Sequence, residues 1–136
     1  MGESATHIKL VEELSSWISV ELLYGDSGPM LIDHPNSNKE ERPPKIEGFI
    51  PDVCIPNGPG NIFIIGEAKT AQDLEKNHSI AQIRGFLRRC SQTPESIFVL
   101  AVPWHMTRLG KNMLRYLKDR IGADNVRTEV LERLID

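Results

Sequence analysis

Apolar residues recur at intervals of three to four residues in three segments, and this spacing predicts three amphipathic helices. The first covers residues 7–23, the second residues 80–90 and the third residues 107–121. Gly122 follows the third segment and marks its end, because glycine readily adopts the left-handed conformation that closes a helix. We therefore expect three helices, each with one buried face.

Five short runs have the composition of β-strands. They cover residues 30–32, 49–55, 62–65, 96–102 and 126–131. The third and fourth runs are apolar on both faces, which is typical of strands in the middle of a sheet. In chain order the elements are helix, three strands, helix, strand, helix and strand. This order predicts an α/β sandwich with a mixed central sheet, antiparallel around a hairpin and parallel across the helical connections.

Length and composition indicate one globular domain over residues 1–136. The chain is 40% hydrophobic and 26% charged, which is ordinary for a soluble protein. No apolar run approaches the length of a membrane span, and the first residues lack the basic and apolar segments of a secretory signal. Cys54 and Cys90 lie in apolar patterns, so we interpret them as buried free thiols, with a disulfide as the alternative. These features predict a cytoplasmic protein without a membrane partner.

The most informative stretch is residues 51–69, where two strand-like runs flank a turn. The turn, residues 57–61, consists of Asn, Gly and Pro, which favour tight reversals. If the runs fold back about this turn, Asp52 lies opposite Glu67, with the two Cβ atoms about 5 Å apart. Alternation along the strand places Lys69 on the same face as Glu67. The hairpin thus gathers two acids and one base at one end of the sheet.

Two neighbouring carboxylates repel each other unless a proton or a cation lies between them. Oxygen ligands suit a hard divalent ion such as Mg²⁺, which keeps water in its other positions. The ammonium of Lys69 is placed to orient an attacking water or to offset developing negative charge. These are the parts needed for metal-assisted hydrolysis of a phosphodiester. The simpler alternative is an ordinary ion pair of Lys69 with Glu67 or Asp52 at a strand end.

The sequence Pro51-Asp52, fourteen further residues and then Glu67-Ala68-Lys69 resembles the motif of the PD-(D/E)XK nuclease superfamily, which includes restriction endonucleases and Holliday-junction resolvases. The resemblance covers nearly the whole chain in the order of elements, but only about five positions in identity. It implies a restriction-endonuclease-like three-layer α/β sandwich, with helices on both sides of a mixed sheet. It also implies that Asp52, Glu67 and the carbonyl of Ala68 ligate Mg²⁺, with Mn²⁺ as a substitute. Lys69 then positions the attacking water or helps to deprotonate it.

Two helical residues complete the site that this resemblance implies. Gln82, about one turn into the second helix, matches a family position that points back to the catalytic edge. The first helix of many members carries an acid that points at the metal, and here Glu12, Glu13 and Glu21 are available. On a helical wheel Glu12 points away from the apolar stripe, Glu13 lies at its edge and Glu21 lies within it. We select Glu13 because family spacing favours it, and surface acids are the alternative for all three.

The net charge of −3 does not by itself favour a nucleic-acid-binding protein, but local clusters of basic side chains can bind phosphates. Arg42 and Lys45, in a polar loop, are predicted phosphate contacts. Arg84 and Arg88, on the second helix, are two more. The alternative is a solvated loop and a solvated helix face.

Further along the chain, a second basic cluster lies between residues 111 and 120 on the third helix, and a solvated face is the simpler reading there too. Trp104 follows the strand at 96–102. We interpret Trp104 as a packing residue, with a nucleic-acid contact as the alternative.

Together these observations predict a Mg²⁺-dependent nuclease that hydrolyses phosphodiester bonds, with DNA as the expected substrate. A homodimer is expected, because a duplex has two strands to cut. One alternative is an inactive module of the same fold that binds nucleic acid or a protein partner. Another is a structural α/β domain in which the motif is accidental.

Overall fold

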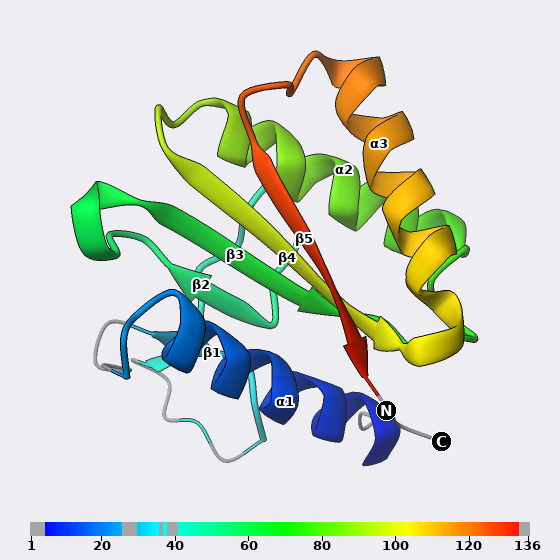
Figure 1. Cartoon of the computed structure of the whole chain (residues 1–136), viewed down its shortest axis with the longest axis horizontal. Helices are drawn as coiled ribbons and strands as arrows, with labels where there is room; N and C mark the ends of the chain where they lie inside the picture. The colour runs from blue at the N-terminus through cyan, green and yellow to red at the C-terminus, as the bar shows by residue number, and fades with distance from the viewer. Residues whose placement is uncertain (1–4, 26–29, 36, 38–40, 134–136) are drawn as a thin grey trace.

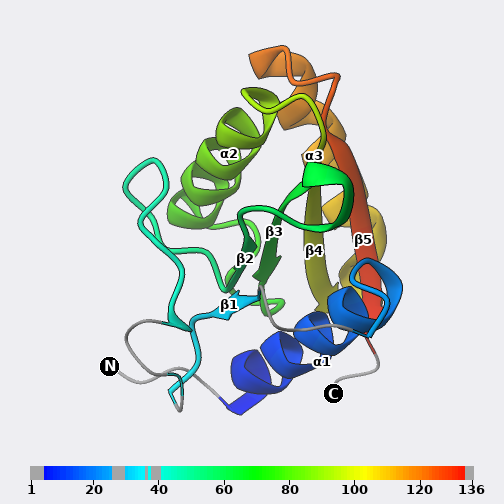
Figure 2. The same cartoon turned by 90° about the vertical axis from the view of Figure 1, so that its left-hand side faces the viewer.

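The computed structural model describes residues 5–25, 30–35, 37 and 41–133. In chain order its elements are α1 (Ala5–Glu21), β1 (Leu31–Ile32), β2 (Val53–Ile55), η2 (Pro59–Asn61), β3 (Phe63–Ala68), α2 (Asn77–Ser91), β4 (Ser96–Pro103), η3 (Trp104–Met106), α3 (Thr107–Ile121) and β5 (Arg127–Arg133). One layer of sheet lies between α1 on one face and α2 with α3 on the other (Figures 1 and 2). The predicted order of helices and strands is confirmed.

The sheet has five strands in the order β1-β2-β3-β4-β5. The pairs β1–β2 and β2–β3 are antiparallel, whereas β3–β4 and β4–β5 are parallel. Parallel neighbours need a crossover, and α2 and α3 supply the two crossovers on the same face of the sheet. The predicted α/β class with a mixed sheet is therefore confirmed.

On one face of the sheet α1 packs directly over β3. Leu10, Leu14 and Ile18 of the helix are fully buried there. The close approach depends on Gly66, because a Cβ at this position would lie 3.0 Å from Cδ1 of Ile18 and 3.1 Å from Cδ2 of Leu14. Glycine in β3 thus fixes how near α1 can come to the strand that carries the motif.

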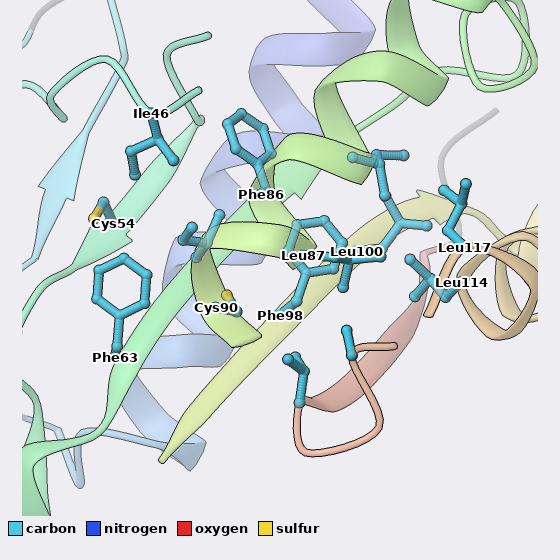
Figure 3. Close-up of a cluster of buried hydrophobic side chains, with 14 of the residues drawn as sticks. Ile46, Cys54, Phe63, Phe86, Leu87, Cys90, Phe98, Leu100, Leu114 and Leu117 are labelled. Carbon is cyan, nitrogen blue, oxygen red and sulfur yellow. The ribbon is translucent and has the colours of Figure 1, made fainter. Parts of the chain in front are cut away.

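The opposite face holds the larger core, which α2 and α3 cover (Figure 3). Its buried side chains include Phe86, Leu87, Phe98, Leu100, Leu114 and Leu117. Cys54 and Cys90 belong to the same core and are free thiols, as predicted. Burial raises the pKa of Cys54 to about 11 and that of Cys90 to about 12.

The strand predicted at 49–55 is shorter in the structure and begins only at Val53. Pro51 has no N–H to donate to a neighbouring strand, and Asp52 lies on a bend. The strand is therefore interrupted at Pro51, and this interruption lies next to Asp52, the first acidic residue of the motif.

Residues 46–49, just ahead of this interruption, form a tight turn that overlaps the predicted strand only at Phe49. The N–H of Ile46 donates to the carbonyl of Phe49 at 2.6 Å, and the N–H of Phe49 donates back at 3.0 Å. The two residues between them, Glu47 and Gly48, have φ angles of 54° and 88°. Two consecutive positive φ angles are typical of a type I′ turn, and they are costly for a residue such as Glu47 that has a side chain.

Candidate active site

The β2–β3 hairpin brings Asp52 and Glu67 together at one end of the sheet. Val53 pairs with Gly66 in the antiparallel ladder, so Asp52 and Glu67 face each other one step further out, in the predicted register. Asp52 is 4% exposed, Glu67 is 3% exposed and Lys69 is 9% exposed. Charged side chains are seldom buried to this degree unless they are paired or bind an ion. The end of the hairpin is therefore a site whose charges need compensation.

Asp52 is fixed by contacts on every side. Its Oδ2 atom accepts a hydrogen bond from the N–H of Ala68 at 2.8 Å and lies 3.3 Å from Nε2 of His7. Its own N–H donates to Oε1 of Glu67 at 3.0 Å, and its carbonyl accepts from the N–H of Asp33 at 2.8 Å. The bend at Asp52 allows its carboxylate to reach across to β3.

Lys69 connects the acidic pair to α2. Its Nζ atom lies 3.3 Å from Oε2 of Glu67 and donates a hydrogen bond to Oε1 of Gln82. The backbone of Lys69 is held as well, because its N–H donates to the carbonyl of Ala101 at 3.0 Å. The predicted residues Asp52, Glu67, Lys69 and Gln82 are thus brought into one contiguous cluster.

The charges of this cluster are not balanced. Burial raises the pKa of Glu67 well above its ordinary value, and the nearby Asp52 carboxylate raises that pKa further. Lys69 acts in the opposite direction, but it does not cancel the two effects. With both carboxyls ionised, the site would hold more negative charge than the ammonium of Lys69 offsets, and a proton on Glu67, a protonated His7 beside Asp52 or a bound cation would stabilise it.

Within the described parts of the chain, no group of three or more His, Cys, Asp or Glu side chains is arranged to hold a metal ion. An ion at the hairpin end would take two side-chain carboxylates, from Asp52 and Glu67. Its other ligands would be backbone carbonyls or water, which suits Mg²⁺ because that ion usually keeps several waters. The proposed ligation by the carbonyl of Ala68 and by Glu13 stays a prediction.

The acids of the first helix lie differently from one another. Glu12 is exposed, with Oε2 3.2 Å from Nε2 of His34, and Glu13 is half-buried. Glu21 is exposed, so its predicted place within the buried stripe is wrong. α1 ends at Glu21, and the chain beyond it buries Leu23 in the same core in place of Glu21.

The first helix reaches Asp52 through His7, a residue that was not among the predicted site residues. His7 lies three residues before Leu10 and seven before Leu14, so it continues the buried stripe toward the N-terminus. That spacing is the signal that identifies it. Glu13 lies six residues from His7, which places it about 9 Å further along the helix and on another side of it.

The predicted phosphate contacts in the polar loop differ in their environment. Nη1 of Arg42 is 2.9 Å from Oδ1 of Asp33, whose backbone pairs with Asp52. Lys45 is exposed. Positions 36 and 38–40 of this loop lie outside the described residues. Arg42 is therefore linked to the site through one residue, and both side chains stay candidates for contact with substrate.

The two arginines of α2 are not brought to the site. Arg84 follows Gln82 by two residues, which is about 200° around the helix, so these two side chains project to opposite sides. Nη1 of Arg88 lies 3.4 Å from Oε1 of Glu47. Both arginines are exposed, but they lie away from the residues that contact Lys69.

Comparison of the chain with protein-family models, curated proteins and solved structures gave no significant match. In the described part of the chain, none of the helices has the length and apolar character needed to cross a membrane. The α/β class rests on the sheet and helices described above. The predicted resemblance to nucleases rests on the motif residues and their arrangement alone.

Proposed function

We propose that this protein is a Mg²⁺-dependent nuclease that hydrolyses phosphodiester bonds in DNA. The observation that supports the proposal most strongly is the buried pair of Asp52 and Glu67, held face to face beside Lys69. A structural ion pair needs one acid and one base. The second buried acid, Asp52, raises the pKa of Glu67 and has the N–H of Ala68 and the ring of His7 as its partners; a bound cation would stabilise both carboxylates together.

The residues fit a hard divalent cation. Asp52 and Glu67 offer carboxylate oxygens, and the excess negative charge of the site would be offset by the ion. When bound, Mg²⁺ supplies Lewis acidity that lowers the pKa of the attacking water and offsets charge on the phosphate. The raised pKa of Glu67 gives this fit a physical basis, because a bound cation favours the ionised form of the carboxyl that burial disfavours.

The protein's own groups then orient the reaction. Gln82 accepts a hydrogen bond from Nζ of Lys69, so the ammonium is held in one direction beside Glu67. From this position Lys69 orients the attacking water and offsets negative charge that develops on the phosphate. The water oxygen forms the new bond to phosphorus and the bond to the leaving oxygen breaks. One proton of the water passes to solvent, and the leaving oxygen takes a proton from solvent to become a hydroxyl. His7 keeps Asp52 in place from the side of α1.

Cleavage of labelled single-stranded, duplex and branched DNA tests this function, with Mg²⁺ or Mn²⁺ and with EDTA. Glu67→Gln removes one carboxylate at constant size, and Glu95→Gln is its matched control, because Glu95 is exposed at the start of β4, at the other end of the sheet. We expect the wild type and Glu95→Gln to cleave only with metal, and Glu67→Gln to lose cleavage. Equal rates for the two variants would refute the assignment.

A second candidate is an inactive module of this fold that binds nucleic acid or a protein partner. One observation favours it: carboxylate oxygens of the pair already accept hydrogen bonds from Ala68 and Asp52, and one lies beside Lys69. Thermal unfolding with and without Mn²⁺ separates the two candidates. The nuclease gains stability with the ion and loses that gain in Asp52→Asn. An inactive module shows no gain in either protein. Assembly as a homodimer stays a prediction for both.

A further inference from the structure

A groove runs between α3 and β5. Its two parts share Lys111, Asn112 and Arg115. One part extends to Trp104 and Arg108 at the start of α3, and the other extends toward Lys118, Thr128 and Val130. None of these residues belongs to the cluster around Asp52 and Glu67.

The α3 wall of the groove is strongly basic. In a chain with a net charge of −3, this fifteen-residue helix carries five basic residues and a single acid, Asp119. Four of the basic residues, Arg108, Lys111, Arg115 and Lys118, recur at intervals of three and four, so they form one stripe about 15 Å long. Such a row of cations is complementary to a row of phosphates.

An exposed indole stands at one end of this stripe. Trp104 is 55% exposed, so its predicted role in packing is wrong. The ring of His105 meets the indole edge-on, with the ring centres 5.6 Å apart, and the hydroxyl of Thr107 donates to the carbonyl of Trp104 at 2.9 Å. The indole is therefore presented to solvent from a backbone that is held in place.

Trp104 also lies at the catalytic end of the sheet. Strands β3 and β4 are parallel, and Ala68 pairs with Ala101, three residues before Trp104. The arrows of β3, β4 and β5 accordingly point to the same end of the molecule, where the turn with Trp104 leads into α3 (Figure 1). A strand lying along α3 would thus arrive at the end of the sheet that holds Lys69.

From these observations we infer that the groove binds a single-stranded segment of the nucleic acid substrate. One unpaired base stacks on Trp104, and the following phosphates pair with Arg108, Lys111 and Arg115. Base stacking on an aromatic side chain beside a basic groove is a general mode of single-strand binding. A fully paired duplex keeps its bases stacked inside, so this mode selects DNA with an unpaired segment. The inference rests on the proposed function only in taking nucleic acid as the substrate.

Acidic residues on the far side of the groove set the path of the strand. Glu129 and Glu132 belong to β5, and Asp124 lies just before it. Glu129 is paired with Arg127 at 3.0 Å, whereas Glu132 is exposed. Asp124 and Glu132 therefore repel phosphates from the β5 side toward α3, whereas Arg127 offsets the charge of Glu129.

Fluorescence anisotropy with a dye-labelled single-stranded oligonucleotide tests the inference. All proteins carry Lys69→Ala and the buffer contains EDTA, so that cleavage plays no part. Trp104→Ala removes the stacking platform, and Lys111→Ala removes one phosphate contact. Arg120→Ala is the matched control, because Arg120 lies on the same helix but off the stripe, 5.6 Å above the ring of Tyr116.

We expect Trp104→Ala to weaken single-strand binding by roughly 5- to 160-fold, the range that stacking of one base provides, with little change for duplex. Trp104→Phe should restore part of the loss. Lys111→Ala should lower the slope of log K against log salt by about 0.7, and Arg120→Ala should change nothing. Unchanged binding by Trp104→Ala, an equal loss on duplex, or no binding by the parent would overturn the inference. Because binding is measured without metal, the binding result can be interpreted even if the protein proves not to cleave DNA.

Discussion

Replacement of Gly85 by alanine tests how tightly the turn at residues 46–49 is held against α2. Gly85 lies in the middle of α2, where glycine is otherwise unfavourable. A Cβ at this position would lie 2.9 Å from Cβ of Glu47 and 3.5 Å from its Cγ. Carbon atoms pack best at about 3.5–4.0 Å, and a Cβ atom cannot rotate out of the way. The new methyl group must therefore push the turn away from the helix.

Two effects of opposite sign decide the size of the change. Replacing glycine by alanine inside a helix stabilises it by about 1 kcal/mol. Forcing an extra carbon into a packed contact costs about 1–3 kcal/mol. We expect the second effect to exceed the first, so that Gly85→Ala lowers the free energy of unfolding by about 1 kcal/mol.

A double-mutant cycle with Glu47→Gly isolates the contact, with stability measured by urea unfolding. Glu47→Gly removes the opposing Cβ and also relieves the positive φ angle of 54° at that residue. Its loss of the exposed pair with Arg88 affects both arms of the cycle equally. In the Glu47→Gly background Gly85→Ala should raise stability by about 1 kcal/mol, so the coupling energy should be about 2 kcal/mol. Stabilisation of the wild type by Gly85→Ala, with no coupling, would refute the reasoning.

Two further predictions follow from buried titratable groups. Because burial and Asp52 raise the pKa of Glu67, the folded protein holds this proton more tightly than the unfolded chain, and stability falls as the pH rises above the ordinary value of 4.5. In urea unfolding, Glu67→Gln should therefore become more stable relative to the wild type as the pH rises. The gain should be about 1.4 kcal/mol for each tenfold difference in proton affinity of Glu67 between the folded and unfolded states. A stability difference that does not change with pH would contradict this. The thiols of Cys54 and Cys90, with pKa values of about 11 and about 12, should not react with a thiol reagent at neutral pH until urea unfolds the protein, and rapid reaction of the native protein would show that they are accessible.

The sequence predicted the hairpin because its signals are local. A turn rich in Gly, Pro and Asn fixes the midpoint, and the midpoint fixes the register that places Asp52 opposite Glu67. The third helix was predicted with its observed bounds, because Gly122 closes it in the left-handed conformation, with φ of 69°. Both features depend on residues close together in the chain.

Other features depend on contacts between distant segments and were not predictable in this way. His7 meets Asp52 only because Gly66 lets α1 lie close over β3. The turn at 46–49, which takes Phe49 out of the predicted strand, packs against Gly85, far along the chain. The exposure of Trp104 depends on where α3 turns back along the sheet.

The central claim is that Asp52, Glu67 and Lys69 form a site for metal-dependent hydrolysis of phosphodiesters. The most direct test is the rate of cleavage of labelled DNA by the wild type and by Lys69→Ala, with Mg²⁺ and with EDTA, after urea unfolding has shown that both proteins are folded. We predict cleavage by the wild type that requires the metal, and a loss of about 100-fold or more in Lys69→Ala, the size of effect expected for a group that assists proton transfer or charge development. Cleavage at the same rate by both proteins, or no cleavage by the folded wild type on any of the substrates, would contradict the claim.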